Sequence, residues 1–207
     1  LYDRATDDRD EIGARLSADR GLTMIKPFDE PQVIAGQGTC GLEIAGQAAE
    51  HGITRADVLV CCGGGGFASG VALALEADAP GLRVRPAEPE GFDDMARSLA
   101  SGVIERNDRV SGSLCDAILT PQPGKLTFPI LARLAGPGLV VSEEEALDAV
   151  ALAFSRLKLV AEPGGGQGHC AAALFHADEI EGDDVIATIS GGNVDADVFR
   201  MALDRLG

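Results

Sequence analysis

Apolar residues in this chain form two alternating patterns, short continuous runs and longer stretches with helical spacing. The clearest runs are Val58–Cys62, Leu82–Ala87 and Val185–Ile189. Each is short and bounded by polar or turn-forming residues, which is typical of buried strands. Shorter runs predict further strands at Leu22–Ile25, Leu114–Leu119, Leu139–Val141 and Leu159–Ala161.

Stretches with helical spacing separate these runs. They predict helices over Asp7–Arg20, over Gly41–His51, from Ala68 onward, from Ser142 to Leu157 and over Val198–Leu206. Gly21 is a suitable C-cap for the first helix. A turn at Gly36–Gly38 would place Thr39 as the N-cap of the second. Ser142 and Glu145 have the spacing of a capping box.

Strands that alternate with helices are typical of a parallel sheet. The pattern therefore predicts an α/β fold, with a mostly parallel sheet and helices on both faces. Ligands of such sheets bind at the carboxyl ends of the strands. The composition fits, since 27 of the 207 residues are glycine, as tight turns between strands and helices require.

Charge and cysteine usage narrow the functional class. The net charge of −16 disfavours nucleic acid and anionic membranes as partners, because both attract Lys and Arg. No apolar run reaches transmembrane length. Neither the cysteines nor the histidines have metal-ligand spacing, so we expect reduced, mostly buried thiols in a cytoplasmic protein. These residues are Cys40, Cys61, Cys62, Cys115, Cys170, His51, His169 and His176.

Four consecutive glycines, Gly63–Gly66, separate the predicted strand Val58–Cys62 from a predicted helix. Backbone N–H groups and a helix N-terminus at such a loop favour an anion such as a phosphate. One interpretation is dinucleotide binding, because the loop and Ala68 match G-x-G-x-x-A and Glu88 ends the next strand. A nucleotide P-loop is excluded, since no Lys-Ser or Lys-Thr follows the glycines.

Two other predicted strands end in polar or small residues, which supports a second interpretation. Ser190–Asn193 follows the strand Val185–Ile189, and Glu162–Gly165 follows Leu159–Ala161. A flat heteroaromatic phosphate could lie across the three strand ends. Its phosphate would then bind the glycine loop, and its ring nitrogen would bind Ser190.

Several motifs, taken together and in order, resemble the fold-type II pyridoxal-phosphate (PLP) enzymes of the serine/threonine dehydratase and serine racemase family. The resemblance covers nearly the whole chain and implies a tryptophan synthase β-like fold. The motifs are Val33–Thr39 (VIAGQGT), Gly63–Gly66, Ala87–Glu90 (AEPE), Lys158–Pro163 (KLVAEP) and Ile189–Asp195 (ISGGNVD).

The resemblance implies a role for each matching residue. The backbone N–H groups that would bind the cofactor phosphate belong to Gly63, Gly64, Gly65, Gly66 and Phe67. Ser190 would hydrogen-bond the pyridine nitrogen, and Glu162 and Gly124 would line the pocket close to the ring.

A divalent cation (Mg, Mn or Ca) is implied near the cofactor phosphate. Its ligands would be Glu88, Asp94 and the carbonyl of Phe92, all hard oxygen donors. Without the resemblance, the acidic residues here would indicate a solvated turn. Similarly, Glu162 could be a surface carboxylate at a strand end.

The chain departs from the family pattern in two places. After Glu162–Gly165 the family continues with small apolar residues, whereas this chain has Gly166–His169. The family's cofactor-linking lysine lies in an early Ser-x-Lys-x-Arg segment, and none of Lys26, Lys125 and Lys158 has that context. We therefore expect a fragment that lacks the N-terminal part and is inactive alone. Residues 1–30 would end a small mobile domain, and residues 31–207 would form the second half of the large PLP-binding domain.

The resemblance implies an ammonia-lyase that converts L-threonine or L-serine to a 2-oxo acid and ammonia. Serine racemase and 3-hydroxyaspartate dehydratase activities remain open within the family, and an NAD(P)-binding domain remains open outside it. The expected partners are a small hydroxy amino acid and a second copy in a homodimer, with no isoleucine feedback. Neither nucleic acid nor a membrane is expected to bind.

Overall fold

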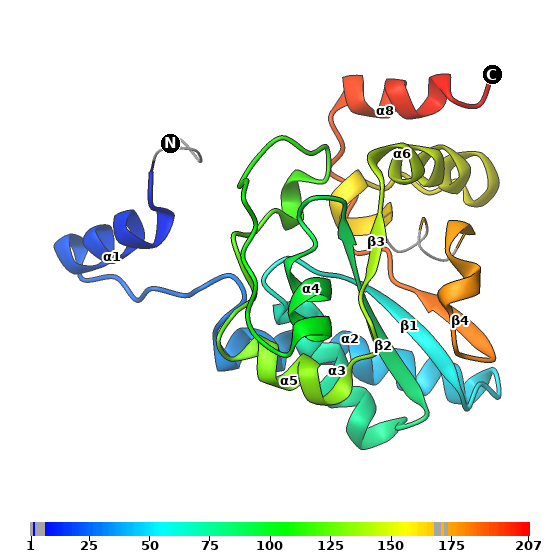
Figure 1. The fold of residues 1–207 in the computed structure, drawn as a ribbon, viewed down its shortest axis with the longest axis horizontal. Helices are drawn as coiled ribbons and strands as arrows, with labels where there is room; N and C mark the ends of the chain where they lie inside the picture. The colour runs from blue at the N-terminus through cyan, green and yellow to red at the C-terminus, as the bar shows by residue number, and fades with distance from the viewer. Residues whose placement is uncertain (1, 3–6, 168–170, 172–173) are drawn as a thin grey trace.

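The computed structural model describes residue 2, residues 7–167, residue 171 and residues 174–207. Its centre is a parallel sheet with the strand order β3-β2-β1-β4 (Figure 1). The strands are β1 (Ala56–Cys61), β2 (Leu82–Pro89), β3 (Leu139–Val141) and β4 (Asp184–Ala187). The predicted parallel α/β fold is confirmed.

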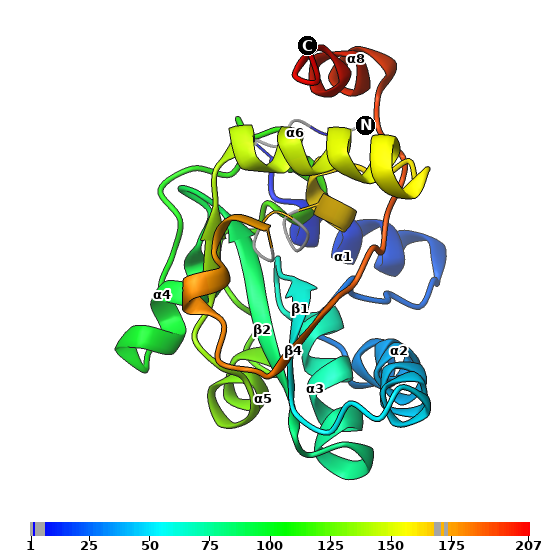
Figure 2. The ribbon, with the colours of Figure 1, turned by 90° about the vertical axis from the view of Figure 1, so that its right-hand side faces the viewer.

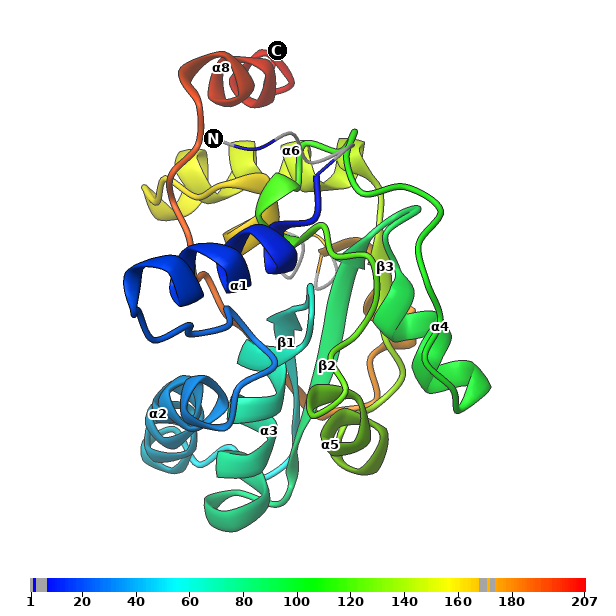
Figure 3. The same ribbon diagram turned by 90° about the vertical axis from the view of Figure 1, so that its left-hand side faces the viewer.

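Helices cover both faces of this sheet. The α-helices are α1 (Arg9–Arg20), α2 (Pro31–Glu50), α3 (Gly66–Asp78), α4 (Asp94–Ser101), α5 (Thr127–Leu134), α6 (Glu143–Leu152) and α8 (Ala196–Asp204). Shorter helical turns are η1 (Asp116–Ile118), η2 (Ala153–Leu157), η3 (Pro163–Gln167) and η4 (Ala177–Glu179). Helices α2, α3 and α5 lie on one side of the sheet, and α6 and α8 lie on the other (Figures 2 and 3).

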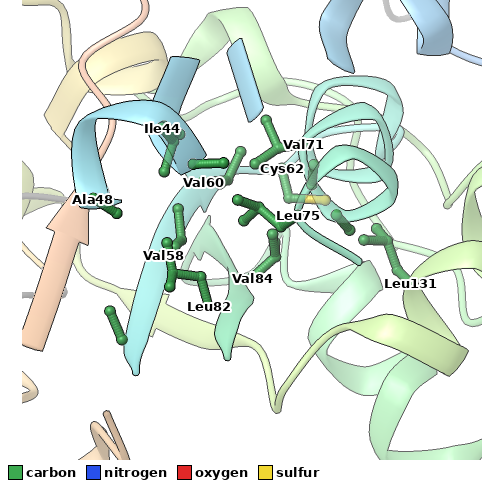
Figure 4. Close-up of a cluster of buried hydrophobic side chains, with 14 of the residues drawn as sticks. Ile44, Ala48, Val58, Val60, Cys62, Val71, Leu75, Leu82, Val84 and Leu131 are labelled. Carbon is green, nitrogen blue, oxygen red and sulfur yellow. The ribbon is translucent and has the colours of Figure 1, made fainter. Parts of the chain in front are cut away.

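Side chains that alternate along β1 divide the core between the two faces. Val58 and Val60 point toward α3 and α2, where Val71 and Leu75 pack against them (Figure 4). Leu59 belongs to the opposite cluster, with residues of β2, β3 and α6. Strand β1 is therefore buried on both faces, which explains why its sequence is a continuous apolar run.

Helix α2 corrects the predicted turn at Gly36–Gly38, because these residues lie within the helix. Tertiary packing explains the difference. A Cβ on Gly70 of α3 would lie 2.4 Å from the carbonyl oxygen of Ile34, and one on Gly41 would lie 2.8 Å from the carbonyl oxygen of Val71. The glycines allow α2 and α3 to approach closely, and this contact outweighs the low helix propensity of glycine.

Three predicted strands are wrong. Leu22–Ile25 and Leu159–Ala161 have no regular structure, and Leu114–Leu119 contains the turn η1 instead. Leu22 and Ile25 are largely exposed, and their segment pairs with none of the described strands. A short apolar run becomes a strand only where a neighbouring strand can pair with it.

Both ends of α1 and the start of α6 are confirmed, whereas α2 begins at Pro31, so Thr39 lies within the helix and is not its N-cap. Helix α1 starts after the cap Asp8 and ends at Gly21, which has the left-handed conformation (φ 63°). The capping box of Ser142 and Glu145 is present at the start of α6. Helix α1 buries none of its residues and lies to one side of the sheet (Figure 1).

Within the described part of the chain, no helix combines the length and apolar character needed to cross a membrane. Cys40, Cys61, Cys62 and Cys115 are free thiols, and all but Cys40 are buried, as predicted. Cys61 and Cys62 pack in different clusters on opposite faces. His169 and Cys170 lie outside the described residues.

Candidate functional site

The carboxyl ends of β1 and β4 lie next to each other because the two strands pair in parallel. Strand β1 ends at Cys61 and continues into the loop Gly63–Gly66, where α3 begins. Strand β4 ends at Ala187 and continues toward Ser190. A cluster of polar groups forms at this edge, as the positions of the motifs predicted.

Backbone N–H donors at the glycine loop are available to bind an anion. The N–H groups of Gly63, Gly64 and Gly65 have no acceptor among the described residues, although Gly64 and Gly65 are buried. Phe67 lies in the first turn of α3, where N–H groups have no partner within the helix. Because buried N–H groups are almost always paired, these donors fit an anionic ligand.

The rest of the protein supports the loop from behind. Gly65 has φ +90°, a left-handed conformation that favours glycine. The carbonyl of Gly64 accepts hydrogen bonds from the Thr127 hydroxyl at 2.6 Å and from the Gly124 N–H at 3.1 Å. Thr127 is fully buried. The protein therefore holds this loop through a carbonyl and leaves its N–H groups to a ligand.

Ser190 lies beside the end of β1. Its hydroxyl donates to the carbonyl of Gly165 and is 3.5 Å from the Cys61 sulfur. Ser190 as a residue is exposed, although the hydrogen bonds of its hydroxyl are partly buried. Burial raises the pKa of the Cys61 thiol to about 11, which outweighs the opposing effect of its hydrogen bond with Ser190. The Cys61 thiol is therefore neutral at physiological pH.

Glu162 lies in the same cluster, although it follows no strand. Its carboxylate accepts the backbone N–H of Asn193 at 3.0 Å, and its own N–H donates to the carbonyl of Gly191 at 3.1 Å. A Cβ on either Gly165 or Gly191 would lie 2.3 Å from this carboxylate. The glycines of the two motifs therefore make room for Glu162, which is half-buried rather than a free surface carboxylate.

Gly124 lies against the glycine loop. Besides donating to Gly64, it packs so closely on Asp29 that an added Cβ would lie 2.3 Å from the Asp29 carboxylate. The structure thus accounts for this glycine by contacts within the protein. Its predicted position close to a cofactor ring stays a prediction.

In the described part of the chain, none of the three lysines interacts with the loop or with Ser190. Lys26 and Lys125 are exposed and line one cavity beside α1. Lys158 ends a helical turn in a left-handed conformation (φ 60°), and its ammonium group donates to the carbonyl of Ser155 at 2.8 Å.

The carboxyl groups of Glu88 and Asp94 are completely buried, which excludes a solvated acidic turn. Glu88 accepts the N–H groups of Met95 (3.0 Å) and Ala96 (2.7 Å) at the start of α4. Asp94 accepts from the Asn107 side chain at 2.6 Å, and its second oxygen is buried without a partner among the described residues. Phe92 is buried beside them.

Burial disfavours the charged form of both carboxyl groups. It raises the pKa of Glu88 well above its ordinary value, and the nearby charge of Asp94 raises it further. Burial also raises the pKa of Asp94 to about 7, against the opposing effect of the Asn107 hydrogen bond. Such a pair can take up a proton or a cation. Among the described residues there is no group of three or more His, Cys, Asp or Glu side chains that could hold a metal ion.

The acidic pair lies behind the glycine loop. Met95, which donates to Glu88, is so close to Gly65 that a Cβ there would lie 2.8 Å from its methyl carbon. The charges of Glu88 and Asp94 also raise the pKa of the Cys62 thiol, although burial is the larger cause. The structure therefore brings together the loop, Ser190 and Glu162 at one edge, with the acidic pair adjacent.

Several residues of this region have no clear signal in the sequence. Cys61 is recognisable there only as a buried thiol, and Asn107 and Thr127 match no motif. Asn107 bonds to Asp94 from a segment without regular structure. From the sequence, Thr127 could be recognised at most as a residue at the start of a helix. Of the departure at Gly166–His169, residues 168 and 169 lie outside the described part.

A family model described as "Pyridoxal-phosphate dependent enzyme" matches residues 1–192. The chain is 36% identical to a serine racemase of Schizosaccharomyces pombe over 206 residues, which cover 99% of this chain and 62% of that protein. It is 34% identical to an L-threonine ammonia-lyase of Thermotoga maritima over 201 residues, which cover 96% of this chain and 48% of that protein.

Solved structures agree with these matches. The threonine deaminase of T.th. has a TM-score of 0.85 and 41% identity over 91% of this chain and 63% of that chain. Maize serine racemase has a TM-score of 0.84 and 31% identity, and the match covers 99% of this chain and 61% of that chain. The chain thus spans less than two thirds of the length of each of these relatives.

Proposed function

Because this chain belongs to the pyridoxal-phosphate dependent enzyme family, we propose that it forms the second half of the cofactor-binding domain of an ammonia-lyase for small hydroxy amino acids, together with the end of the small domain. L-threonine and L-serine are the leading substrates. A serine racemase and an L-threo-3-hydroxyaspartate ammonia-lyase have about the same sequence identity to this chain as the L-threonine ammonia-lyase does. Racemisation and 3-hydroxyaspartate cleavage are therefore the alternative activities. In this proposal residues 1–30 end the small domain and residues 31–207 belong to the large one.

The observation that carries the proposal is the set of available N–H groups at Gly63–Gly65, adjacent to the Ser190 hydroxyl at the next strand end. These N–H groups and that of Phe67 would hold the cofactor phosphate, with the dipole of α3 adding partial positive charge. To hydrogen-bond the unprotonated pyridine nitrogen, the Ser190 hydroxyl would turn away from the Gly165 carbonyl to which it donates in this structure. Glu162, fixed by the Asn193 N–H, would orient the turn that carries Ser190.

Bound PLP supplies an electron sink for the charge that develops when the α-proton of the substrate is removed. A hydroxyl at position 190, unlike a carboxylate, does not hold the pyridine nitrogen protonated. The ring is then a weaker sink, which suits loss of a β-hydroxyl better than transamination. The lysine that would link the cofactor and move the α-proton is proposed to lie outside this sequence.

The first prediction separates PLP from a dinucleotide as the ligand. We expect saturating PLP to raise the Tm of the chain by about 5–10 °C, since ligand at about 100 times its Kd contributes about 2.7 kcal/mol. Pyridoxal, which lacks the phosphate, should have a much smaller effect, and NAD(P) should have none. Thermal unfolding monitored by circular dichroism measures this.

Borohydride reduction of the same PLP-treated samples is the control for covalent binding. We expect only scattered, substoichiometric labelling of Lys26, Lys125 and Lys158 by peptide mapping, and no 2-oxo acid from threonine or serine. Stabilisation by NAD(P) without stabilisation by PLP would overturn the proposed function. Stoichiometric labelling of Lys125 with formation of 2-oxo acid would overturn the proposal that the cofactor-linking lysine lies outside this sequence.

We propose in addition that Glu88, Asp94 and the Phe92 carbonyl bind a divalent cation. The unpartnered, buried oxygen of Asp94 supports this, as do the raised pKa values of both carboxyl groups. Oxygen donors of this kind suit Mg, Mn or Ca. The proposal further includes a homodimer in the cytoplasm.

The second prediction concerns this cation. The folded-state pKa of Asp94, about 7, exceeds its ordinary value, so without metal its contribution to stability falls as the pH rises from about 4 to 7. We therefore expect Mn²⁺ or Mg²⁺ to raise the Tm more at pH 8 than at pH 5. Asp94→Asn should raise the metal-free Tm at pH 8 and abolish the response to metal.

Asp93→Asn is the matched control, because Asp93 is only half-buried and pairs with Arg97 at 3.5 Å. This variant should respond to metal as the unmodified chain does. Equal responses of all three proteins would show that the acidic pair binds no cation.

A further inference from the structure

The glycines of the loop are enclosed by the protein on their Cα side. A Cβ on Gly63 would lie 2.9 Å from the carbonyl oxygen of Ile118. One on Gly64 would lie 2.2 Å from the ring of Phe28, and one on Gly66 would lie 2.8 Å from the Phe28 Cα atom. Two of the four glycines therefore leave room for the same residue.

Phe28 precedes α2, and its neighbour Asp29 fixes the segment in place. The Asp29 carboxylate accepts the backbone N–H of Leu126 at 2.8 Å. The turn that contains Leu126 also supplies Gly124 and Thr127, which both donate to the Gly64 carbonyl. The Gly64 peptide is thus held by hydrogen bonds at its carbonyl and by the Phe28 ring at its Cα atom.

This arrangement restricts the conformation of the loop without using its N–H groups. The donors of Gly63–Gly65 stay available because the described contacts with the loop are made to its carbonyls or Cα atoms. A loop of four glycines has more conformational freedom than any other sequence of that length. An anion site built from it is effective only if another group restricts that freedom.

We propose that Phe28 is a positioning residue that holds the glycine loop in its anion-binding conformation. In this view Gly64 lacks a side chain because the Phe28 ring occupies the space, and close approach by a phosphate is not the reason. The inference rests on the proposed function, since the anion it concerns is the PLP phosphate.

A double-mutant cycle tests this with the 207-residue chain, Phe28→Ala, Gly64→Ala and the double variant. Equilibrium dialysis measures the Kd for PLP and, separately, for pyridoxal. We expect each single substitution to weaken PLP binding about tenfold, as is common for residues in contact, and to change pyridoxal binding little. In the double variant the methyl group added at position 64 occupies space vacated by the ring, so PLP binding should be no weaker than in Phe28→Ala alone.

Phe154→Ala is the matched control. Phe154 packs edge-to-face on Phe199 with ring centroids 5.3 Å apart, and it belongs to the π-helical turn η2 rather than to the loop. We expect Phe154→Ala to have a lower Tm than the unmodified chain and the same Kd for PLP. The conservative variant Phe28→Leu should bind PLP better than Phe28→Ala does.

The outcomes separate the inference from the function beneath it. PLP binding that is unaffected by Phe28→Ala, or additive losses in the double variant, would overturn the positioning role alone. Absence of PLP binding by the unmodified chain would overturn the proposed function, and the inference with it.

Discussion

Replacement of Arg85 by methionine is expected to lower the free energy of unfolding by about 3–5 kcal/mol, the cost of removing one partner from a buried ion pair. Arg85 lies in β2, and its side chain is 2% exposed. Its guanidinium donates to Asp57 at 2.9 Å and to the carbonyls of Glu179 (2.8 Å) and Pro137 (2.6 Å).

The size of the effect follows from what the substitution leaves behind. Asp57 on β1 is also buried, and without Arg85 its described partner is the Glu181 N–H at 2.8 Å. The carbonyls of Pro137 and Glu179 would lose a donor as well. Since an isolated buried carboxylate is costly, methionine cannot compensate by packing alone. The ion pair thus ties the segments before β3 and β4 to the sheet.

Urea unfolding at neutral pH measures the change, with Arg55→Met as the matched control. Arg55 pairs with Asp183 at the same distance of 2.9 Å, but both side chains are more than half exposed. Surface pairs of this kind contribute about 0–1 kcal/mol. Comparable losses for Arg85→Met and Arg55→Met would contradict the role assigned to burial.

The loop and the strands that carry it could be predicted because local sequence determines them. Val58–Cys62 is continuously apolar, and the glycines that follow cannot continue a strand, so the order of strand, loop and helix followed directly. Parallel pairing of β1 and β4 then brought Ser190 to the same edge as the loop, as the position of its motif implied. Glu162 follows no strand, and it reaches this edge through its hydrogen bonds with Gly191 and Asn193.

Other parts depend on contacts between distant segments and have no local signal. Residue types alone indicate an exposed turn from Glu88 to Asp94, yet both carboxyl groups are buried, that of Glu88 against the start of α4 and that of Asp94 against the Asn107 segment. Phe28 likewise belongs to no periodic pattern. Its contact with Gly64 follows from the path of the chain between α1 and α2.

The glycines of α2 show how tertiary packing can reverse a local preference. Gly36–Gly38 predicted a turn because glycine is a poor helix former. In the structure Gly38 faces Gly70 across the α2–α3 contact, where a Cβ on Gly38 would lie 3.2 Å from the Gly70 carbonyl oxygen. The same residue type that disfavours a helix in isolation makes this helix pair possible.

Gly70→Ala is therefore expected to destabilise the protein by about 1–3 kcal/mol, the usual cost of overpacking a close contact. A Cβ at this position would lie 2.4 Å from the Ile34 carbonyl oxygen and 2.6 Å from the Gly38 nitrogen. These are backbone atoms of α2, so relief requires a shift of a whole helix. Because α3 begins at the glycine loop, the shift should also weaken PLP binding.

Gly46→Ala makes the same chemical change on the exposed face of α2, where a Cβ would meet no atom within 4 Å. Alanine is favoured over glycine in a helix interior by about 0.5–1 kcal/mol, so this variant should be more stable than the unmodified chain. Urea unfolding measures the change in the free energy of unfolding, which should be a loss for Gly70→Ala and a gain for Gly46→Ala. Equilibrium dialysis measures the Kd of each variant for PLP. If Gly70→Ala is as stable as Gly46→Ala and binds PLP normally, the close contact between α2 and α3 does not determine the position of the loop.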